Sequence, residues 1–418
     1  MKYSIFKWLL LGLFLRLLIM PFSFHGHDIF YIYYYPFKFI TQNFYDPYAW
    51  IALHNPHNQY YSPLVLHFFS FFLIIFKPFL PFLENLFQTF EAWNFTWEGN
   101  SIHYASVFSD LQLFRTLFLF KMPYLICDLG CGWILTKLFE DRSKAILAFK
   151  CWMLNPFTLH SAFALGQMDI IPTFLILAAF ISYKKSWIAA TTLLLCAGLF
   201  KIYAILLLPY FAMTHLKTFS DRHKAVLWCL LFCSILYLPF LISSKTIALE
   251  ALFFGSSRVS SLNTILFISL YVLLLIYLWW KCRTQTPTFE STFLSLIIPL
   301  LLFFSLQTVT IRYFIVVTPM LIFLALTYKT FWIYNALFFI SLFGMSLGGN
   351  TQQWGLFAPL EPRFFSSLPI LDSYLTLFMD LKLIHQLLFR VFVITCLIVI
   401  AHSVYLVKKH YEQLKNLS

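Results

Sequence analysis

Charged residues are scarce in this chain of 418 residues, because Asp, Glu, Lys and Arg together make up 11% of it. About a quarter of the residues in soluble domains are charged, so the composition argues against a soluble globular protein. Hydrophobic residues make up 61% and the mean hydropathy is +0.78. These values are typical of a protein that crosses the membrane many times.

Acidic residues are scarcer than basic ones, with 17 Asp and Glu against 29 Lys and Arg, and the formal net charge is +12. In a soluble protein this excess would suggest a nucleic-acid partner. Here the basic residues mostly lie between apolar runs, as expected of Lys and Arg that hold cytoplasmic loops. We therefore expect membrane lipids as the surroundings and no nucleic-acid partner.

Motifs of several soluble enzyme classes are missing as well. No Walker A loop, dinucleotide-binding glycine motif, zinc-protease motif or nucleophile elbow occurs in a supporting context. The eight cysteines lack the spacing of a metal site, and several stand inside apolar runs, so we interpret them as small core hydrophobes. No metal ligand set is predicted, although a divalent cation is left open as a cofactor.

The apolar runs predict an all-α polytopic membrane protein, a single integral-membrane domain over residues 1–418. The runs cover residues 5–22, 64–77, 114–137, 145–162, 170–183, 186–200, 202–216, 225–242, 262–280, 291–306, 311–328, 330–346 and 387–407. The run 64–77 is short and carries His67 and Lys77, so it is better interpreted as an interfacial helix. We expect about 11–14 transmembrane helices, with interfacial helices in the first outer loop.

Basic clusters recur after every second apolar run from Lys137 onward, so a consistent topology places all of them in the cytoplasm. The segments on the opposite face are then residues 25–114, 162–169, 243–261, 307–310 and 347–385, together with a turn near Lys201. The N-terminal run lacks a small-residue cleavage site and is expected to be a retained helix. The protein would lie in the cell membrane of a bacterium or in the endoplasmic reticulum of a eukaryote.

Two histidines and an aspartate follow the first apolar run, in the stretch SFHGHDIFYIYYYP at residues 23–36. An aspartate just outside a membrane helix, here Asp28, can act as a general base because partial burial raises its pKa toward the working range. The alternative is a solvated carboxylate beside an interfacial belt of aromatic side chains. His25 and His27, next to Asp28, are candidate substrate ligands.

A second polar stretch, LNPFTLHSAFALGQMDIIPTF at residues 154–174, lies on the same predicted face. Asn155-Pro156 should break or kink the helix, and Gly166, Gln167 and Asp169 then form a polar turn. The alternative is a plain hairpin turn, which needs Gly and Pro but does not need Gln and Asp together.

Charged residues inside or beside the apolar runs form a third group, which includes Arg16 in the first run. Such charges usually face a bundle interior, a cavity or one another. Lys121 and Asp128 are seven residues apart and so lie on one helical face, where they are candidates for a structural pair. Lys201 and Arg312, both expected near the outer face, suit an anionic group such as a phosphate. Alternatively, each of these two snorkels to the interface.

In their order along the chain, these pieces resemble the glycosyltransferase C superfamily, multispanning enzymes that use lipid-phosphate sugars as donors. The segments that carry the resemblance are DIFY at 28–31, DPY at 46–48, YYSPL at 60–64, KMPYLICDL at 121–129, LNPFTLHSAFALGQMD at 154–169, LFKIYAILLLP at 199–209 and QTVTIRYFIVVTP at 307–319. They look most similar to the mannosyltransferase-like branch, which includes glycosylphosphatidylinositol mannosyltransferase I and bacterial polyprenyl-phosphate mannosyltransferases. The resemblance implies a catalytic module over residues 1–210. Residues 211–418 would be more variable transmembrane helices with an outer loop at 347–385.

The resemblance also implies an inverting hexosyltransferase, with mannose as the expected sugar. Its donor would be a polyprenyl-phosphate sugar, and its acceptor a glycan or glycolipid on the non-cytoplasmic face. Asp28 would be the catalytic base. The residues expected to bind substrate are His25, His27, Lys121, Asp128, Gln167, Asp169, Lys201 and Arg312. The related enzymes show a second acidic residue two positions after the base, but Phe30 stands there in this chain, which argues against a metal-bridging carboxylate pair.

Two other functions fit a multispanning chain with a few buried charges. A lipid or sugar transporter or flippase often shows internal repeats and broken helices in matching halves. Neither pattern is apparent in this sequence, and the polar residues gather at one face instead of the midplane. A non-catalytic membrane scaffold is the third alternative.

Overall fold

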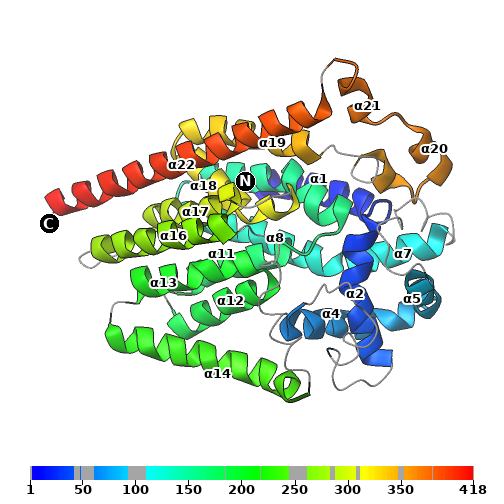
Figure 1. The fold of residues 1–418 in the computed structure, drawn as a ribbon, viewed down its shortest axis with the longest axis horizontal. Coiled ribbons are helices and arrows are strands. Elements are labelled where there is room, and N and C mark those ends of the chain that lie inside the picture. The colour runs from blue at the N-terminus through cyan, green and yellow to red at the C-terminus, as the bar shows by residue number, and fades with distance from the viewer. Residues whose placement is uncertain are drawn as a thin grey trace.

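The computed structural model describes residues 2–41, 48, 61–92, 110–183, 185–216, 218–243, 261–282, 288–306, 311–346, 353–378 and 380–417 (Figure 1). No β-strand occurs in these ranges, so the predicted all-α class is confirmed for the described part of the chain. Asp46 and Pro47 of the DPY segment, and residues 307–310, lie outside the described ranges.

The regular elements of the described ranges are helices of different lengths. The α-helices are α1 (Lys2–Ile19), α2 (Gly26–Thr41), α4 (Pro63–Phe76), α5 (Leu83–Ala92), α7 (Asp110–Phe120), α8 (Met122–Lys137), α9 (Arg142–Met153), α10 (Pro156–Thr158), α11 (Ile170–Ser182), α12 (Trp187–Phe200), α13 (Leu207–His215), α14 (Phe219–Ser243), α16 (Ser261–Cys282), α17 (Phe289–Leu306), α18 (Thr318–Thr327), α19 (Thr330–Ser346), α20 (Pro362–Ser367), α21 (Leu371–Leu375) and α22 (Leu381–Leu417). The 3-10 helices are η1 (Lys77–Phe79), η3 (Ile202–Leu206), η5 (Ile311–Val316) and η7 (Trp354–Phe357), and η2 (Leu159–Leu165) is a π-helix.

Three helical stretches in the described part are long and apolar enough to cross a membrane, namely Gln112–Lys137, Phe219–Phe240 and Leu381–His410. A crossing takes about 20 residues of helix. Seven further apolar helices have 10–17 residues, which is shorter than a full crossing. By helix length alone, the described part therefore has fewer transmembrane helices than the sequence predicts.

The weak apolar run 64–77 forms α4, and the chain then bends by 119° between the stretches Pro63–Phe79 and Leu83–Thr89. The start of α4 is well defined: the backbone N–H of Val65 donates to Oγ of Ser62 at 3.4 Å, and Pro63 occupies the first turn. Serine caps and first-turn prolines are favoured at helix starts. The bend excludes a single straight span through this region.

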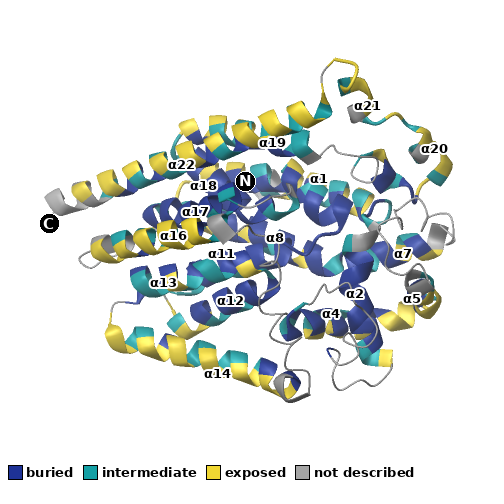
Figure 2. Cartoon of the chain, viewed as in Figure 1, coloured by how far each residue is buried: buried dark blue, intermediate teal, exposed yellow. Residues whose placement is uncertain are grey.

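A continuous apolar core joins elements from both halves of the chain. Helix α11 packs against α8 and α12, and α17 packs against α18 and α22. Figure 2 shows the inner helices mostly buried, whereas α14, α16 and α22 are exposed along one side. On α14 the exposed side chains include Leu227, Leu230 and Ile235. Large exposed apolar surfaces of this kind mark contact with a membrane or with a partner.

Candidate active site

Asp28 lies in the first turn of α2, after a short loop that hydrogen bonds attach to the rest of the protein. The hydroxyl of Ser23 donates to the carbonyl of Phe163 at 3.3 Å. The backbone N–H of His25 donates to the carbonyl of Leu165 at 3.0 Å. Both acceptors belong to the π-helix η2, so these bonds connect the first predicted polar stretch to the second.

The helix break predicted at Asn155-Pro156 is confirmed. Helix α9 ends at Met153, and Oδ1 of Asn155 accepts a hydrogen bond from the backbone N–H of Thr158 at 3.2 Å at the start of α10. The chain then widens into the π-helix η2. Single π-helical turns of this type are frequent at functional sites.

Gly166 ends the π-helix and allows the two polar turns to approach each other. Its φ of +85° is a left-handed conformation that residues with a side chain rarely adopt. A Cβ atom at this position would lie 3.1 Å from Cβ of Ile29, the residue that follows Asp28. Glycine therefore meets both a conformational and a steric requirement at this point.

Three side chains hold Asp28. Nη1 of Arg312 lies 2.8 Å from each carboxylate oxygen, and Nδ1 of His25 lies 2.9 Å from Oδ2. The side chain of Gln167 adds a further hydrogen bond. Burial acts to raise the pKa of Asp28, but Arg312 and His25 outweigh it and hold this pKa well below its ordinary value. Asp28 is therefore a carboxylate at neutral pH.

Asp169 is the second carboxylate of the site, and it is enclosed more fully. The Tyr203 hydroxyl donates to Oδ1 of Asp169 at 2.6 Å, and Nζ of Lys201 lies 3.5 Å from Oδ2. Burial raises the pKa of Asp169 by more than Lys201 and Tyr203 lower it, so the pKa stays above its ordinary value. Lys201 itself stands in extended backbone between α12 and η3, where the chain turns back.

The ring of Tyr313 lies beside both cations. Its centroid is 4.9 Å from Nζ of Lys201 and 5.9 Å from Cζ of Arg312, within the range of cation–π attraction. After burial and the contacts already described, the charge of Arg312 also acts to lower the pKa of Asp169. In the same way, the charge of Asp28 acts to raise the pKa of Lys201. The two predicted carboxylates and the two predicted cations thus form one network, which we call the charge cluster: Asp28, Asp169, Lys201 and Arg312.

One side of the charge cluster is accessible. The side chains of Arg312, Lys201 and Asp28 are 20%, 15% and 10% exposed, and that of Asp169 is 1% exposed. A ligand that approaches from outside therefore reaches the two cations and Asp28 more readily than the enclosed Asp169.

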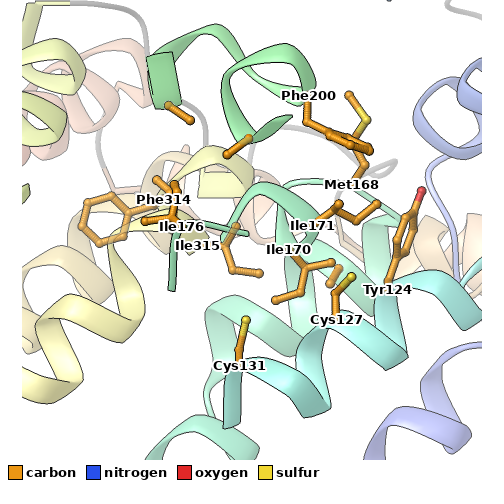
Figure 3. Close-up of a cluster of buried hydrophobic side chains, with 14 of the residues drawn as sticks. Tyr124, Cys127, Cys131, Met168, Ile170, Ile171, Ile176, Phe200, Phe314 and Ile315 are labelled. Atoms are coloured by element: carbon orange, nitrogen blue, oxygen red, sulfur yellow. The ribbon is translucent and has the colours of Figure 1, made fainter. Parts of the chain in front are cut away.

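Apolar chain neighbours of the site residues fasten them to the core. Figure 3 shows these neighbours in one buried cluster: Met168, Ile170, Ile171, Phe200, Phe314 and Ile315. Buried apolar residues directly precede or closely follow Asp169, Lys201 and Arg312 in the chain, so these side chains project from a packed backbone. Cys127 and Cys131 of α8 complete the cluster and are buried as free thiols, which confirms their interpretation as core residues.

The tyrosines beside the charge cluster were not predicted from the sequence. Besides Tyr203 and Tyr313, Tyr61 lies near enough for its pKa to be raised by burial and, further, by the charge of Asp28. A signal for two of them was present, since Tyr203 follows Lys201 by two positions and Tyr313 follows Arg312 directly. Both pairs lie where an apolar run begins.

Lys121 lies outside the charge cluster and is fully buried. Its Nζ donates to the carbonyls of Met20 at 3.0 Å and Phe163 at 2.6 Å, and also to the carbonyl of Ser23. Lys121 thus joins the end of α1, the loop before Asp28 and the π-helix. These bonds are consistent with a positioning role for Lys121, because they fix the two polar stretches relative to each other.

The expected pair between Lys121 and Asp128 is wrong, because Asp128 pairs with Arg16. Nε of Arg16 lies 2.5 Å from Oδ2 of Asp128 and Nη2 lies 3.2 Å from Oδ1. Nη1 of Arg16 also donates to the carbonyls of Gly12 and Met153 at 2.9 and 2.7 Å. Lys121, directly before α8, and Asp128 within α8 are both fully buried, but α1 supplies the cation that reaches the carboxylate.

His27 lies in the first turn of α2, and its side chain is outside the described part of the structure. Among the described residues no group of three or more His, Cys, Asp or Glu is placed to hold a metal ion. Phe30, at the position where the superfamily that the sequence resembles has a second acidic residue, is fully buried in the core.

Comparison of the chain with protein-family models, with curated proteins and with solved structures found no match. The resemblance to the glycosyltransferase C superfamily therefore stays a prediction from the sequence motifs, and the function has to be argued from the site.

Proposed function

We propose that this protein is an integral-membrane glycosyltransferase that moves a hexose from a polyprenyl-phosphate donor to an acceptor hydroxyl on the non-cytoplasmic face. The observation that supports it most is the charge cluster, in which a partly exposed carboxylate, Asp28, adjoins two cations, Arg312 and Lys201. The reaction needs a base for the acceptor and positive charge for the leaving phosphate. Mannose is the expected sugar, and a glycan or glycolipid is the expected acceptor.

In the proposed reaction, the Asp28 carboxylate takes the proton of the acceptor hydroxyl while the hydroxyl oxygen attacks the anomeric carbon of the sugar. A new carbon–oxygen bond forms as the bond between the anomeric carbon and the phosphate oxygen breaks. The electron pair of that bond leaves with the polyprenyl phosphate. Attack from the face opposite the leaving group inverts the configuration of the anomeric carbon.

The two cations suit the leaving group in different ways. The planar guanidinium of Arg312 matches phosphate oxygens through paired hydrogen bonds, whereas Lys201 acts as a point charge. The phosphate gains negative charge as it departs, and cations already in place stabilise that charge without a reorganisation of solvent. Asp169 and Tyr203 serve this step indirectly, because they keep Lys201 at the edge of the site.

Several features support the membrane setting of the proposal. In the described part of the chain, three helical stretches are long and apolar enough to cross a membrane, and other helices are shorter but apolar. Helix α14 exposes leucine and isoleucine side chains, as expected of a surface that contacts lipid chains or the apolar tail of a donor. The proposed side of the membrane follows from the basic clusters between the apolar runs.

The test is a transfer assay with purified protein, polyprenyl-phosphate mannose, glucose or arabinose, and candidate lipid and glycan acceptors. We expect a glycosylated product with one donor and a loss of at least about 100-fold in rate for Asp28→Asn. Glu412→Gln is the matched control, because this exposed carboxylate lies in an ion pair with Lys408 at 3.9 Å, far along the chain from the site. Full activity of Asp28→Asn would reject Asp28 as the base.

The transporter alternative gives a different result in the same preparation. Movement of a lipid or sugar across liposome membranes without any glycosidic product, under all donor and acceptor combinations, would replace the transferase proposal.

A further inference from the structure

Asp28 is a weak proton acceptor while Arg312 is hydrogen-bonded to its carboxylate. Both of its carboxylate oxygens are 2.8 Å from Nη1 of Arg312, and Oδ2 also faces His25 at 2.9 Å. A carboxylate oxygen engaged by a cation has a reduced affinity for a proton. The base that transfer requires is thus masked in this arrangement.

Arg312 is also the residue that a phosphate would engage most readily. Of the four side chains in the charge cluster it is the most exposed, at 20%, and it extends from the short helix η5, which Phe314 and Ile315 anchor in the core. A guanidinium carries five N–H donors, and both contacts to Asp28 are made by Nη1. A phosphate oxygen that binds Nη1 therefore competes with the carboxylate for it.

The charges of the cluster favour such an exchange. Each of its two cations already has a carboxylate partner. A bound phosphate therefore has to compete with one of the two carboxylates for a cation. Lys201 lies 3.5 Å from Asp169, which is 1% exposed and is itself held by Tyr203. Arg312 is 20% exposed and its contact Asp28 is 10% exposed, so an incoming anion reaches the Arg312–Asp28 pair more readily than the Lys201–Asp169 pair.

We propose that the phosphate of the donor takes Arg312 from Asp28, so that Asp28 becomes an effective base only when the leaving group is already bound. This inference rests on the proposed function for the nature of the ligand. No proton moves in the exchange: Arg312 forms hydrogen bonds to the phosphate oxygens, and the freed carboxylate can accept one from the acceptor hydroxyl. The acceptor is then activated in the presence of the donor and not before.

The direct test is a structure determined by electron cryo-microscopy with a short-chain isoprenyl phosphate that carries no sugar. We expect Nη1 of Arg312 to donate a hydrogen bond to a phosphate oxygen and to lie more than about 3.5 Å from both carboxylate oxygens of Asp28. A complex in which the phosphate is bound while Arg312 keeps both contacts to Asp28 would overturn the exchange, and so would a complex in which the phosphate binds away from Arg312.

A titration gives a second and independent readout. The carboxylate band of Asp28 can be followed by infrared difference spectroscopy, with Asp28→Asn to identify the band. We expect saturating isoprenyl phosphate to raise the pKa of Asp28 by about 1 to 3 in the unmodified protein. In Arg312→Gln the pKa should be raised before the ligand is added and should change less on binding. Arg115→Gln, a change at an exposed arginine, should behave as the unmodified protein does.

An equal response in Arg312→Gln and in the unmodified protein would contradict the exchange, because the phosphate charge alone would then account for the effect. The structure of the unmodified protein with the isoprenyl phosphate decides the matter even if the variant fails to fold. Neither readout needs sugar transfer. A protein that shows the exchange but transfers no hexose would overturn the proposed function, and one that transfers hexose without the exchange would overturn this inference.

Discussion

Nη1 of Arg312 lies 2.8 Å from each carboxylate oxygen of Asp28, although the two residues are 284 positions apart in the chain. This contact joins η5 in the second half of the chain to the start of α2 in the first half. The site therefore depends on both parts of the sequence, including residues 211–418, which the resemblance implies to be the more variable part. Four experiments examine how this site and its supports work.

We expect Lys201→Met to lower kcat/KM for the polyprenyl-phosphate donor by about 100-fold, because a cation beside the leaving phosphate is removed. Lys201→Arg should recover part of the lost kcat/KM, since arginine keeps the positive charge but replaces the compact ammonium group with a planar guanidinium. Lys185→Met, at an exposed lysine in the turn before α12, is the control and should leave the donor kinetics unchanged. A Met variant with normal donor kinetics would exclude Lys201 from the phosphate site.

The Asp28–Arg312 pair should stabilise the fold over an unusually wide pH range. The pKa of Asp28 is depressed in the folded protein. The ionised carboxylate therefore contributes fully to the free energy of unfolding above the unfolded pKa of about 3.9, and this contribution is lost as the pH falls through the folded pKa. We expect the unmodified protein to unfold about 2–4 °C above Asp28→Asn, by a margin that holds from pH 7 to about pH 4 and shrinks below it. A margin that vanished near pH 6 would contradict the assignment.

Gly166 should be sensitive to backbone conformation as well as to volume. Gly166→Val and Gly166→Asn both place a Cβ against Ile29, but Asn tolerates a positive φ better than a β-branched residue does. We expect Val to be the more destabilising of the two, with the left-handed conformation itself costing about 1–2 kcal/mol, and both to reduce transfer. Thermal unfolding and the transfer assay measure the two effects, and equal stability of the two variants would argue against conformational strain at this turn.

The Arg16–Asp128 pair should show strong coupling in a double-mutant cycle. Both side chains are fully buried, so Arg16→Met or Asp128→Leu alone leaves an uncompensated charge and is expected to cost about 3–5 kcal/mol. The double variant should lose less free energy of unfolding than the two single variants lose together, because neither charge remains. Reversible unfolding in detergent gives the four free energies, and simple additivity would show that the pair does not act as a unit.

Much of the fold was predictable because it is local. The apolar runs from 114–137 to 387–407 correspond to helices of the structure, and the break at Asn155-Pro156 stands where the missing proline N–H requires it. The polar turn at Gly166–Asp169 was also predicted. What the pattern did not show was that a π-helix and a positive φ at Gly166 bring this turn against Ile29, since those features depend on the neighbouring α2.

Pairing of the charges was predicted only in part. Helical spacing predicted that Lys121 and Asp128 share one helical face, but spacing within a helix does not say what lies opposite that face. Arg16 reaches Asp128 from α1, whereas Lys121 donates to carbonyls of Met20 and Ser23, before Asp28, and of Phe163 in the π-helix.

The sequence by itself determined where the helices form, which positions are apolar, and which few polar residues lie at the ends of the apolar runs, because these properties depend on neighbours within a few turns of the chain. Only the tertiary structure decided which carboxylate meets which cation. Contacts across 112 and 284 positions depend on how separate helices pack, and packing is fixed by the sum of many apolar contacts that no local pattern contains.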